Sequence, residues 1–221
     1  MKKIYNFIIK THVIYLLIPI GIYLFKAQLY HFNRVHGTDN YHVVNMKIDD
    51  IIPFCKYFAV FYVSYYWLPQ FMLWVLSFYD KKKYWILTIS FALSCVLANV
   101  FFYFYNVKMD LRATVDGNDI FSYLVKWVYN KDKSALNCFP SIHAVLGVTL
   151  FLVGFRTKNI PKYWKVIALV FGIGTVLSTV FVKQHYFVDM IAGVVLAVIV
   201  YIITAIIFNH IVNKRKLKED K

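Results

Sequence analysis

Acidic residues and cysteines are both scarce in this chain. Its 221 residues include 11 Asp and Glu against 25 Lys and Arg, so the formal net charge is +14. Three cysteines are too few for the disulfide framework that holds small secreted proteins together. No linker, internal repeat or low-complexity tract divides the chain, and the sequence therefore predicts one domain over residues 1–221.

Apolar residues, by contrast, dominate the composition. They make up 60% of the chain and the mean hydropathy is +0.57, values well above those of a soluble domain. Within the apolar segments, Pro69 predicts a kink and Asn99 a contact between helices. The predicted fold class is all-α, a polytopic membrane protein built as a six-transmembrane-helix bundle, because a span needs about 20 residues. The six predicted spans are about Tyr5–Phe25, Tyr57–Tyr79, Tyr84–Val107, Asn137–Phe155, Val166–Val182 and Met190–Val212.

The first of these segments is the least regular. Lys10, His12 and Pro19 interrupt it, and two lysines precede it as they would precede a signal peptide. The residues Phe25-Lys26-Ala27-Gln28 that follow make a poor cleavage site, because they offer no pair of small residues. We therefore expect a helix that is retained.

The distribution of Lys and Arg predicts the orientation in the membrane. If both termini are cytoplasmic, the inner segments hold 15 of the 25 basic residues and hold them more densely than the outer segments. The sequence thus predicts a multi-pass protein of the cell membrane with two long outer loops, about Lys26–Pro53 and Lys108–Phe139. Cys55 and Cys138 both fall on the outer side, although nothing in their spacing demands that they pair. The positive charge is explained by topology and by anionic headgroups, so membrane lipids are predicted partners, nucleic acid is not, and no oligomeric state is indicated.

The first outer loop carries His31, His36 and His42, which could suggest a metal site. No cysteine or close ligand pair accompanies them, and this favours a solvated loop that faces the headgroups. Asp49 and Asp50 are expected to begin the second helix, because the positive end of a helix dipole favours acidic residues.

The second outer loop contains an amphipathic segment, Asp119–Tyr129. Its residues Ile120, Leu124, Trp127 and Val128 fall on one face at helical spacing. This pattern predicts a short helix that lies on the outer membrane surface, with either a structural or a lipid-guiding role.

Asp189 is the only acidic residue inside an apolar segment, and it lies four residues after His185. A carboxylate in such a segment is costly, so it indicates a function by default. If both residues belong to one helix they share a face, and Asp189 would accept a hydrogen bond from His185 Nδ1–H. That bond would leave Nε2 as a nucleophile. The alternative is a pair that only joins helices.

A second histidine, His143, lies in the segment Pro140-Ser141-Ile142-His143. Ser141 is a good N-cap, and the free N–H groups of a helix start suit an anion such as phosphate. His143 would lie in the first turn, where it could protonate a leaving oxygen. An ordinary capped helix start is the alternative. The predicted topology places both histidines at one outer face, which favours a catalytic site over two accidents.

These motifs carry a resemblance to a known family. The order P-S-x-H, then about 40 residues, then H-x-x-x-D with a following Gly resembles the type 2 phosphatidic acid phosphatase superfamily. The wording QHYFVDMIAG and FPSIH is closest to the inositol phosphorylceramide synthase-like branch, and the motif-bearing part is about residues 57–212. The resemblance implies that His185 is the nucleophile and His143 the acid, and that neither a metal nor a cofactor is needed. In this scheme Asp189 orients His185.

The third motif departs from the family pattern in its positive charge. Ser178 matches the serine, but Thr179 stands where the motif has an arginine. Lys183, two residues before His185, is expected to supply the missing charge.

The first motif is only partly present. Arg112 fits its arginine, while Ala113 replaces its proline and Tyr105 stands at its lysine position. Lys108 is expected to substitute for that lysine. The predicted phosphate-binding residues are Ser141, Arg112, Lys108 and Lys183.

The predicted function is hydrolysis of a lipid phosphate substrate, a phosphomonoester or a diphosphate, at the outer membrane face through a phosphohistidine at His185. Attack on a phosphodiester with a lipid alcohol as acceptor would make the chain a lipid headgroup phosphotransferase instead. Two other classes are alternatives. A proton-coupled transporter would use Asp189 and His185 and predicts more ionisable residues through the bilayer. An intramembrane protease would need Ser141 free as a nucleophile.

Overall fold

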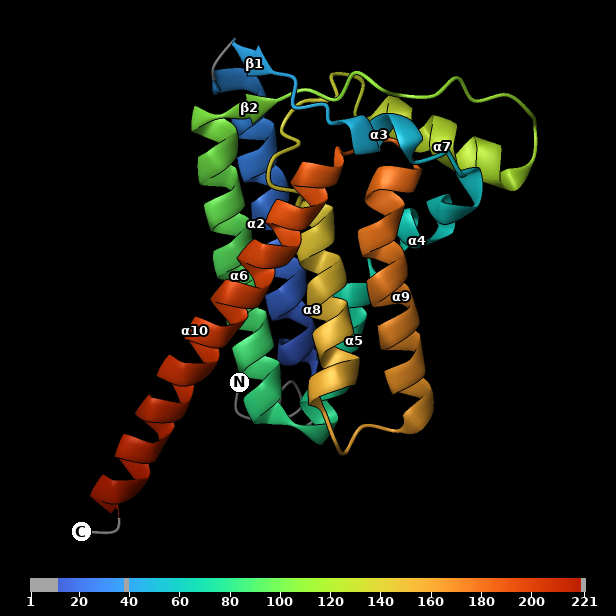
Figure 1. Cartoon of the computed structure of the whole chain (residues 1–221). Helices are drawn as coiled ribbons and strands as arrows, with labels where there is room; N and C mark the ends of the chain where they lie inside the picture. Colours follow the sequence, from blue (N-terminus) through green and yellow to red (C-terminus); the bar gives the residue numbers. More distant parts are fainter. Residues whose placement is uncertain (1–11, 38–39, 220–221) are drawn as a thin grey trace.

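The computed structural model describes residues 12–37 and 40–219, and helices make up most of this part of the chain. Two short strands pair in parallel. Figure 1 shows that the start of α2 and the end of α10 lie at the same end of the bundle. The elements in chain order are α2 (Val13–His36), β1 (Tyr41–His42), α3 (Lys47–Ile51), the 3₁₀ turn η1 (Lys56–Phe58), α4 (Ala59–Ser64), α5 (Leu68–Tyr79), α6 (Lys81–Phe104), β2 (Asn106–Val107), α7 (Ile120–Lys131), α8 (Ile142–Arg156), α9 (Lys162–Phe181) and α10 (Phe187–Glu219).

In the described part of the chain four helices are long and apolar enough to cross a membrane, namely α2, α6, α9 and α10. A fifth span results if the bent pair of η1–α4 and α5 counts as one. The remaining predicted span, the fourth at about Asn137–Phe155, is represented by the 15 residues of α8. At 1.5 Å per residue, α8 is only about 22 Å long. The helices are those of a polytopic membrane protein, with four or five spans by length where the sequence predicts six.

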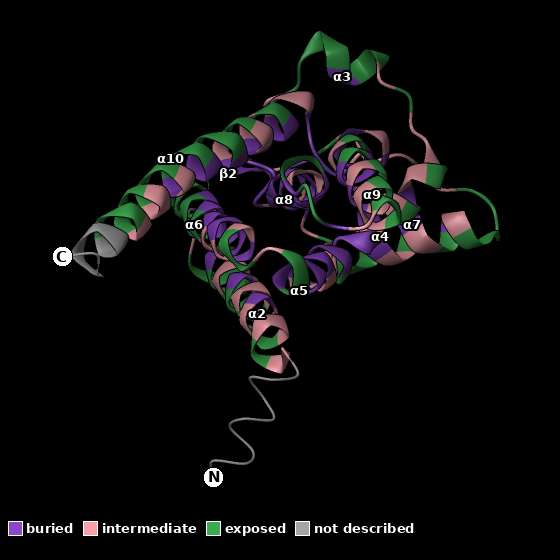
Figure 2. Cartoon of the chain, turned by 90° about the horizontal axis from the view of Figure 1, so that it is seen from below, coloured by how far each residue is buried: buried purple, intermediate pink, exposed green. Residues whose placement is uncertain are grey.

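Helix α8 lies inside the bundle. It packs against α9, α10, α6 and α5, and ten of its 15 residues are buried. Figure 2 shows it enclosed by its neighbours. Gly172 of α9 permits the close approach, because a Cβ there would lie 2.6 Å from the backbone nitrogen of Phe151. A helix that meets protein along its length does not need to match the thickness of the bilayer.

Helix α2 lies further along the chain than the predicted first span. It covers Val13–His36, so the first part of the predicted loop at about Lys26–Pro53 is helical. Asn33 of α2 explains the extension, because its side-chain amide donates to the side-chain and backbone oxygens of Asn99 on α6. These bonds also confirm the predicted helix contact at Asn99. Residues 5–11 of the predicted span lie outside the described part of the chain. The basic residues Lys2, Lys3, Lys10 and Lys221 also lie outside it.

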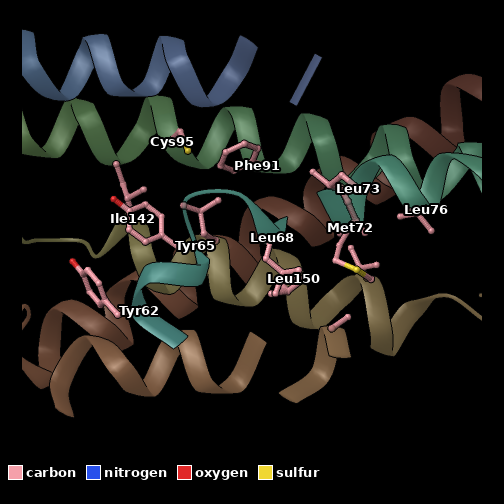
Figure 3. Close-up of a cluster of buried hydrophobic side chains, with 14 of the residues drawn as sticks. Tyr62, Tyr65, Leu68, Met72, Leu73, Leu76, Phe91, Cys95, Ile142 and Leu150 are labelled. Carbon is pink, nitrogen blue, oxygen red and sulfur yellow. The ribbon is translucent and has the colours of Figure 1, made fainter. Parts of the chain in front are cut away.

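The second predicted span is broken in its middle. Helix α4 ends at Ser64, α5 begins at Leu68, and the two are bent by 47°. Pro69 lies in the first turn of α5, where its missing N–H is tolerated and where it disfavours helix just before it. This confirms the predicted kink. Figure 3 shows Tyr62 and Tyr65 at one end of the buried cluster, beside the start of α8.

Asp49 and Asp50 do lie in the first turn of a helix, as predicted, but this helix is not the second span. They belong to the five-residue α3, which ends before Pro53 because the residue ahead of a proline disfavours helix. Asp49 is 3% exposed, and its carboxylate accepts the backbone N–H of Phe187 over 2.6 Å. The acidic residue therefore joins α3 to the start of α10.

Helix α7 confirms the predicted short helix in the second loop. Its N-cap is Asp119, whose carboxylate accepts backbone N–H groups of the first turn. The buried face agrees with the predicted apolar face only in part, at Val128. Ser122, Val125 and Val128 are buried, whereas Ile120 is 61% exposed.

The two ends of the bundle contain different segments. The sheet, α3, α7, the end of α9 and the starts of α8 and α10 gather at one end (Figure 1). The α5–α6 junction with Lys81–Lys83 and the α8–α9 loop lie at the other end. The segments predicted to share a side of the membrane therefore do share an end of the molecule. Which end faces the cytoplasm stays a prediction.

Candidate active site

His185 lies in the turn between α9 and α10, and not on a helix. The backbone N–H groups of Gln184 and His185 both donate to the carbonyl oxygen of Thr179, each over 3.0 Å. The residue at the position of the family arginine thus fixes the turn through its backbone. Because α10 begins only at Phe187, His185 and Asp189 do not share the helical face that the sequence predicts.

His143 lies in the first turn of α8, and the cap of this helix is the predicted one. The Ser141 hydroxyl oxygen accepts the N–H of Ala144 over 3.2 Å. The backbone N–H of Ser141 donates to the backbone carbonyl of Asp189 over 3.0 Å, which ties the start of α8 to the start of α10. Gly193 permits this contact, because a Cβ at that position would overlap the Ser141 carbonyl oxygen.

The two histidines meet directly. His143 Nδ1 lies 2.9 Å from His185 Nε2, and His185 Nδ1 lies 3.0 Å from the carbonyl oxygen of Cys138. A carbonyl can only accept a hydrogen bond, so a neutral His185 ring carries its proton on Nδ1 and has a lone pair on Nε2. That lone pair then accepts the proton of His143 Nδ1.

The same polarity continues to Tyr62. With its proton on Nδ1, His143 accepts at Nε2, and the Tyr62 hydroxyl donates to it over 3.0 Å. The ring of Tyr62 also stacks on His143, and Tyr65 meets His143 edge-on, with centroid distances of 4.6 and 4.3 Å. Sequence reasoning missed both tyrosines, since the break between α4 and α5 is what brings them to the histidine.

Asp189 is fully buried, at 0% exposure. Its Oδ2 lies 3.7 Å from His185 Nδ1, which is too far for a hydrogen bond, and the Cys138 carbonyl takes the predicted place. Oδ2 accepts the backbone N–H of Tyr186 over 2.9 Å, whereas Oδ1 has no hydrogen-bond partner among the described residues. At this distance the carboxylate acts on His185 by charge, and it favours a positively charged ring.

Arg112 reaches the site through two residues that line it. Its Nη1 donates to the backbone carbonyl of Asp132 over 2.6 Å, and its Nη2 donates to the Asp132 carboxylate and to the Gln184 side-chain oxygen. The Tyr129 ring lies against the guanidinium, and its centre is 4.9 Å from Arg112 Cζ. Within the described part of the chain, Arg112 Nε and the Gln184 amide nitrogen have no hydrogen-bond partner. Two buried donors are therefore unused at this side of the site.

Lys108 and Lys183 do not come to the histidines. The Lys108 ammonium lies 4.6 Å from the ring centre of Tyr41 and lines a different cavity. The Lys183 ammonium donates to the backbone carbonyls of Asp49 and Ile52, each over 2.6 Å. The turn around Lys183 extends its side chain to α3, so this lysine does not take the place of the missing family arginine.

A cavity of about 190 Å³ lies beside the two histidines. Sequence reasoning missed most of its wall, because these residues come from α2, the α4–α5 break and α7, which carry no family motif. Lys26 in particular was expected in a loop. The polar side chains in the wall, besides His143 and His185, are Tyr23, Lys26, Tyr30, Tyr62, Tyr65, Tyr66, Lys131, Asp132, Asn137, Cys138 and Gln184.

One group of side chains has the composition of a metal site. The ligand atoms of Cys138, His185 and Asp189 lie within 4.8 Å of one another. Metal binding needs a thiolate and a free ring nitrogen. Burial raises the pKa of the Cys138 thiol well above its ordinary value, and a carbonyl engages His185 Nδ1, so the group fits a metal poorly as it stands. In the described part of the chain no such group includes His31, His36 or His42.

Comparison with known proteins agrees with this geometry. The PAP2 superfamily matches residues 27–203, a stretch that contains both histidines, Asp189 and Arg112. No curated protein and no solved structure matches the chain. Because the matched stretch covers well over half of its length, the chain belongs to the PAP2 superfamily.

Proposed function

We propose that this chain is an integral membrane lipid phosphatase that hydrolyses a lipid phosphomonoester or diphosphate through a phosphohistidine at His185, on the outer face of the cell membrane. Membership of the PAP2 superfamily suggests an activity of the lipid phosphate phosphatase type. The observation that carries the residue assignment is the 2.9 Å contact between His143 Nδ1 and His185 Nε2 at the wall of a cavity.

In the first step a bond forms between His185 Nε2 and phosphorus, while the bond from phosphorus to the lipid oxygen breaks. The Cys138 carbonyl keeps the His185 proton on Nδ1, so the lone pair on Nε2 can attack once the substrate phosphate has replaced the contact with His143. In this step His143 acts as an imidazolium that carries a proton on each nitrogen, with Nε2–H directed to the Tyr62 oxygen. Its Nδ1 proton passes to the departing oxygen, and a neutral ring remains. Asp189 stabilises the positive charge that the His185 ring acquires.

In the second step water replaces the histidine. The water oxygen attacks phosphorus, its proton returns to His143 Nδ1, and the bond between phosphorus and His185 Nε2 breaks. Tyr62 supports both steps as a positioning residue, because its hydroxyl and its ring hold the His143 imidazole in one orientation.

The phosphate oxygens need hydrogen-bond donors that are free in the resting site. The Gln184 amide nitrogen meets this requirement at the cavity wall, where the described residues leave it unused. Arg112 holds the Gln184 side chain and has an unused Nε of its own. Ser141 contributes through the backbone N–H groups at the start of α8 rather than through its hydroxyl, which the cap occupies. In this assignment Lys108 and Lys183 act outside the site.

A lipid headgroup phosphotransferase is the second candidate. Five tyrosines line the cavity, Tyr23, Tyr30, Tyr62, Tyr65 and Tyr66, and their hydroxyls offer hydrogen-bond partners to a lipid alcohol. If such an alcohol replaces water in the second step, the same two histidines transfer the group and no free phosphate appears.

The two other classes are less well supported. Among the described residues, the buried acidic, basic and histidine side chains are Lys26, Asp49, His185 and Asp189. These four form no path along the bundle of the kind that a proton-coupled transporter would need. Ser141 is 0% exposed and its hydroxyl caps α8, so it is a poor protease nucleophile.

A rapid-quench assay with p-nitrophenyl phosphate tests the assignment of the two histidines. His185→Ala should form no phosphoenzyme at all. His143→Ala should still phosphorylate His185, because p-nitrophenol leaves with little need for a proton. It should then hydrolyse the intermediate slowly, so that an acid-labile phosphohistidine accumulates. If His185→Ala traps phosphate and His143→Ala cannot, the two roles are reversed.

Chelation tests the metal-independent chemistry that is typical of PAP2 superfamily enzymes. Activity of the purified protein should survive EDTA, and vanadate should inhibit it by mimicking pentacoordinate phosphorus. Loss of activity on chelation, with recovery on added Zn²⁺ or Mg²⁺, would assign a metal to the group of Cys138, His185 and Asp189 and contradict the proposed mechanism.

A further inference from the structure

Two lysines of the cavity wall belong to no motif, Lys26 and Lys131, and of these only Lys26 is buried. Lys26 lies on α2, is 7% exposed, and lines the same cavity as His143 and His185. The family match begins at residue 27, immediately after this lysine. Lys26 also lies outside the sequence motifs that carry the resemblance.

The Lys26 ammonium has no acidic partner in the resting protein. Among the described residues, no carboxylate lies within ion-pair distance of it, and its neighbours are the rings of Tyr23 and Tyr65 at 4.5 and 5.4 Å. Contacts with ring faces stabilise an ammonium only weakly. Removing the ammonium from water costs more than such contacts return, even after relaxation of the surroundings. The site therefore holds a cation that the protein itself does not neutralise, beside a cavity that an anion can enter.

The position of Lys26 relative to the histidines suggests which anion this is. The Tyr65 ring contacts both the Lys26 ammonium and the His143 ring, the latter with a centroid distance of 4.3 Å. Tyr65 thus links the two, and the ammonium has no direct contact with either histidine. A phosphoryl group at His185 Nε2 would meet His143 first, and Lys26 would meet the next group along the headgroup.

We propose that Lys26 binds a second phosphate of the substrate headgroup and makes the chain prefer a lipid diphosphate to a lipid monophosphate. This rests on the proposed function. His185 Nε2 forms its bond with the terminal phosphorus, the bond to the bridging oxygen breaks, and the lipid monophosphate leaves with the proton of His143. Lys26 neutralises the charge on that leaving phosphate. Because a lipid monophosphate lacks this group, it gains nothing from the lysine.

The test compares two substrates of the same lipid chain, the diphosphate and the monophosphate, on protein reconstituted in vesicles. Lys26→Met, which keeps the length of the side chain and removes its charge, should lower kcat/KM about 30- to 300-fold for the diphosphate and less than about 3-fold for the monophosphate. Lys26→Arg should retain the preference for the diphosphate. The matched control is Lys126→Met, an exposed lysine on α7 that donates to the Gly117 carbonyl, and it should leave both rates unchanged.

Thermal stability separates binding from a structural role. Loss of a buried, unneutralised ammonium should leave the Tm of Lys26→Met equal to or above that of the wild type. A lower Tm with equal losses on both substrates would make Lys26 a structural residue and overturn the proposal, as would an unchanged preference in Lys26→Met. A wild-type protein that hydrolyses neither substrate would instead overturn the proposed function.

Discussion

Helices α8 and α10 both begin beside a histidine of the site, yet they have different surroundings. Helix α8 has 15 residues, of which ten are buried. Helix α10 has 33 residues, and only 28% of the residues in its most apolar stretch are buried. At their starts the two are joined by the bond from the Ser141 N–H to the Asp189 carbonyl. The difference teaches that the site depends on a short junction, and that the rest of α10 is held by its apolar surface rather than by the site.

The largest effect is expected from breaking that junction. In Gly193→Ala the new methyl group would overlap the Ser141 carbonyl oxygen, so α10 must move away from α8. Because misplacing catalytic groups by about 1 Å is costly, we expect kcat/KM to fall about 100-fold or more. Gly21→Ala is the matched control, since a Cβ at Gly21 has nothing within 4 Å. Equal activity of the two variants would show that the junction does not position the histidines.

A smaller effect is expected from changing charge at the junction without changing its shape. Asp189→Asn keeps an oxygen that can accept the Tyr186 N–H but removes the negative charge beside His185. We expect kcat to fall about 10- to 100-fold, with KM and the circular dichroism spectrum almost unchanged. If KM rises and kcat stays constant, Asp189 serves substrate binding and does not stabilise the charged ring.

Residues in the middle of α8 and of α10 should contribute differently to the free energy of unfolding. Leu150 of α8 is 0% exposed, so Leu150→Ala should lower the free energy of unfolding by about 2–5 kcal/mol through the cavity that it leaves. Ile206 of α10 is 64% exposed, and Ile206→Ala should cost less than about 1 kcal/mol, since lipid tails are as apolar as the side chain that they touch. Both values can be measured by denaturant unfolding in mixed micelles. A comparable loss at Ile206 would indicate a protein contact on the exposed face of α10.

The smallest effect on catalysis is expected at the turn that leads into α10. Lys183→Ala removes two hydrogen bonds to α3 and touches no group of the cavity. The Tm should fall, while kcat/KM should stay within about 10-fold of the wild type, because each lost bond contributes only about 1 kcal/mol. A fall of 100-fold or more at unchanged Tm would return Lys183 to the phosphate-binding role that the sequence predicts.

Sequence reasoning was most successful where the signal is local. The kink before Pro69, the cap at Ser141 and the helix after Asp119 all depend on a few neighbouring residues, and all three are present. The placement of both histidine segments at one end of the bundle follows from the alternation of apolar segments, and it is also observed (Figure 1).

Contacts between distant segments could not be predicted in the same way. The partner of His185 Nδ1 is a backbone carbonyl, that of Cys138, and any residue type can supply such a group. Tyr62 meets His143 only because a helix breaks, and Lys26 is in the cavity only because α2 continues beyond the first apolar stretch. Lys108 and Lys183 were predicted to bind phosphate because they lie close to the motifs in sequence. In the structure their ammonium groups contact Tyr41 and α3 instead, since closeness in sequence says little about closeness in space.

The bond between the two histidines has a consequence for the empty enzyme under the proposed mechanism. With both rings neutral, the bond has one possible direction, in which His143 donates and His185 accepts. The catalytic acid therefore blocks the nucleophile, since the proton of His143 occupies the lone pair of His185. The His185 ring is therefore unreactive in the resting site. Imidazole-directed reagents such as diethyl pyrocarbonate should modify His185 slowly while the two rings are in contact. When a substrate phosphate separates the two rings, the Nε2 lone pair of His185 becomes available for attack and the Nδ1 proton of His143 becomes available for the leaving oxygen. Substrate binding thus activates the nucleophile and the acid in one step.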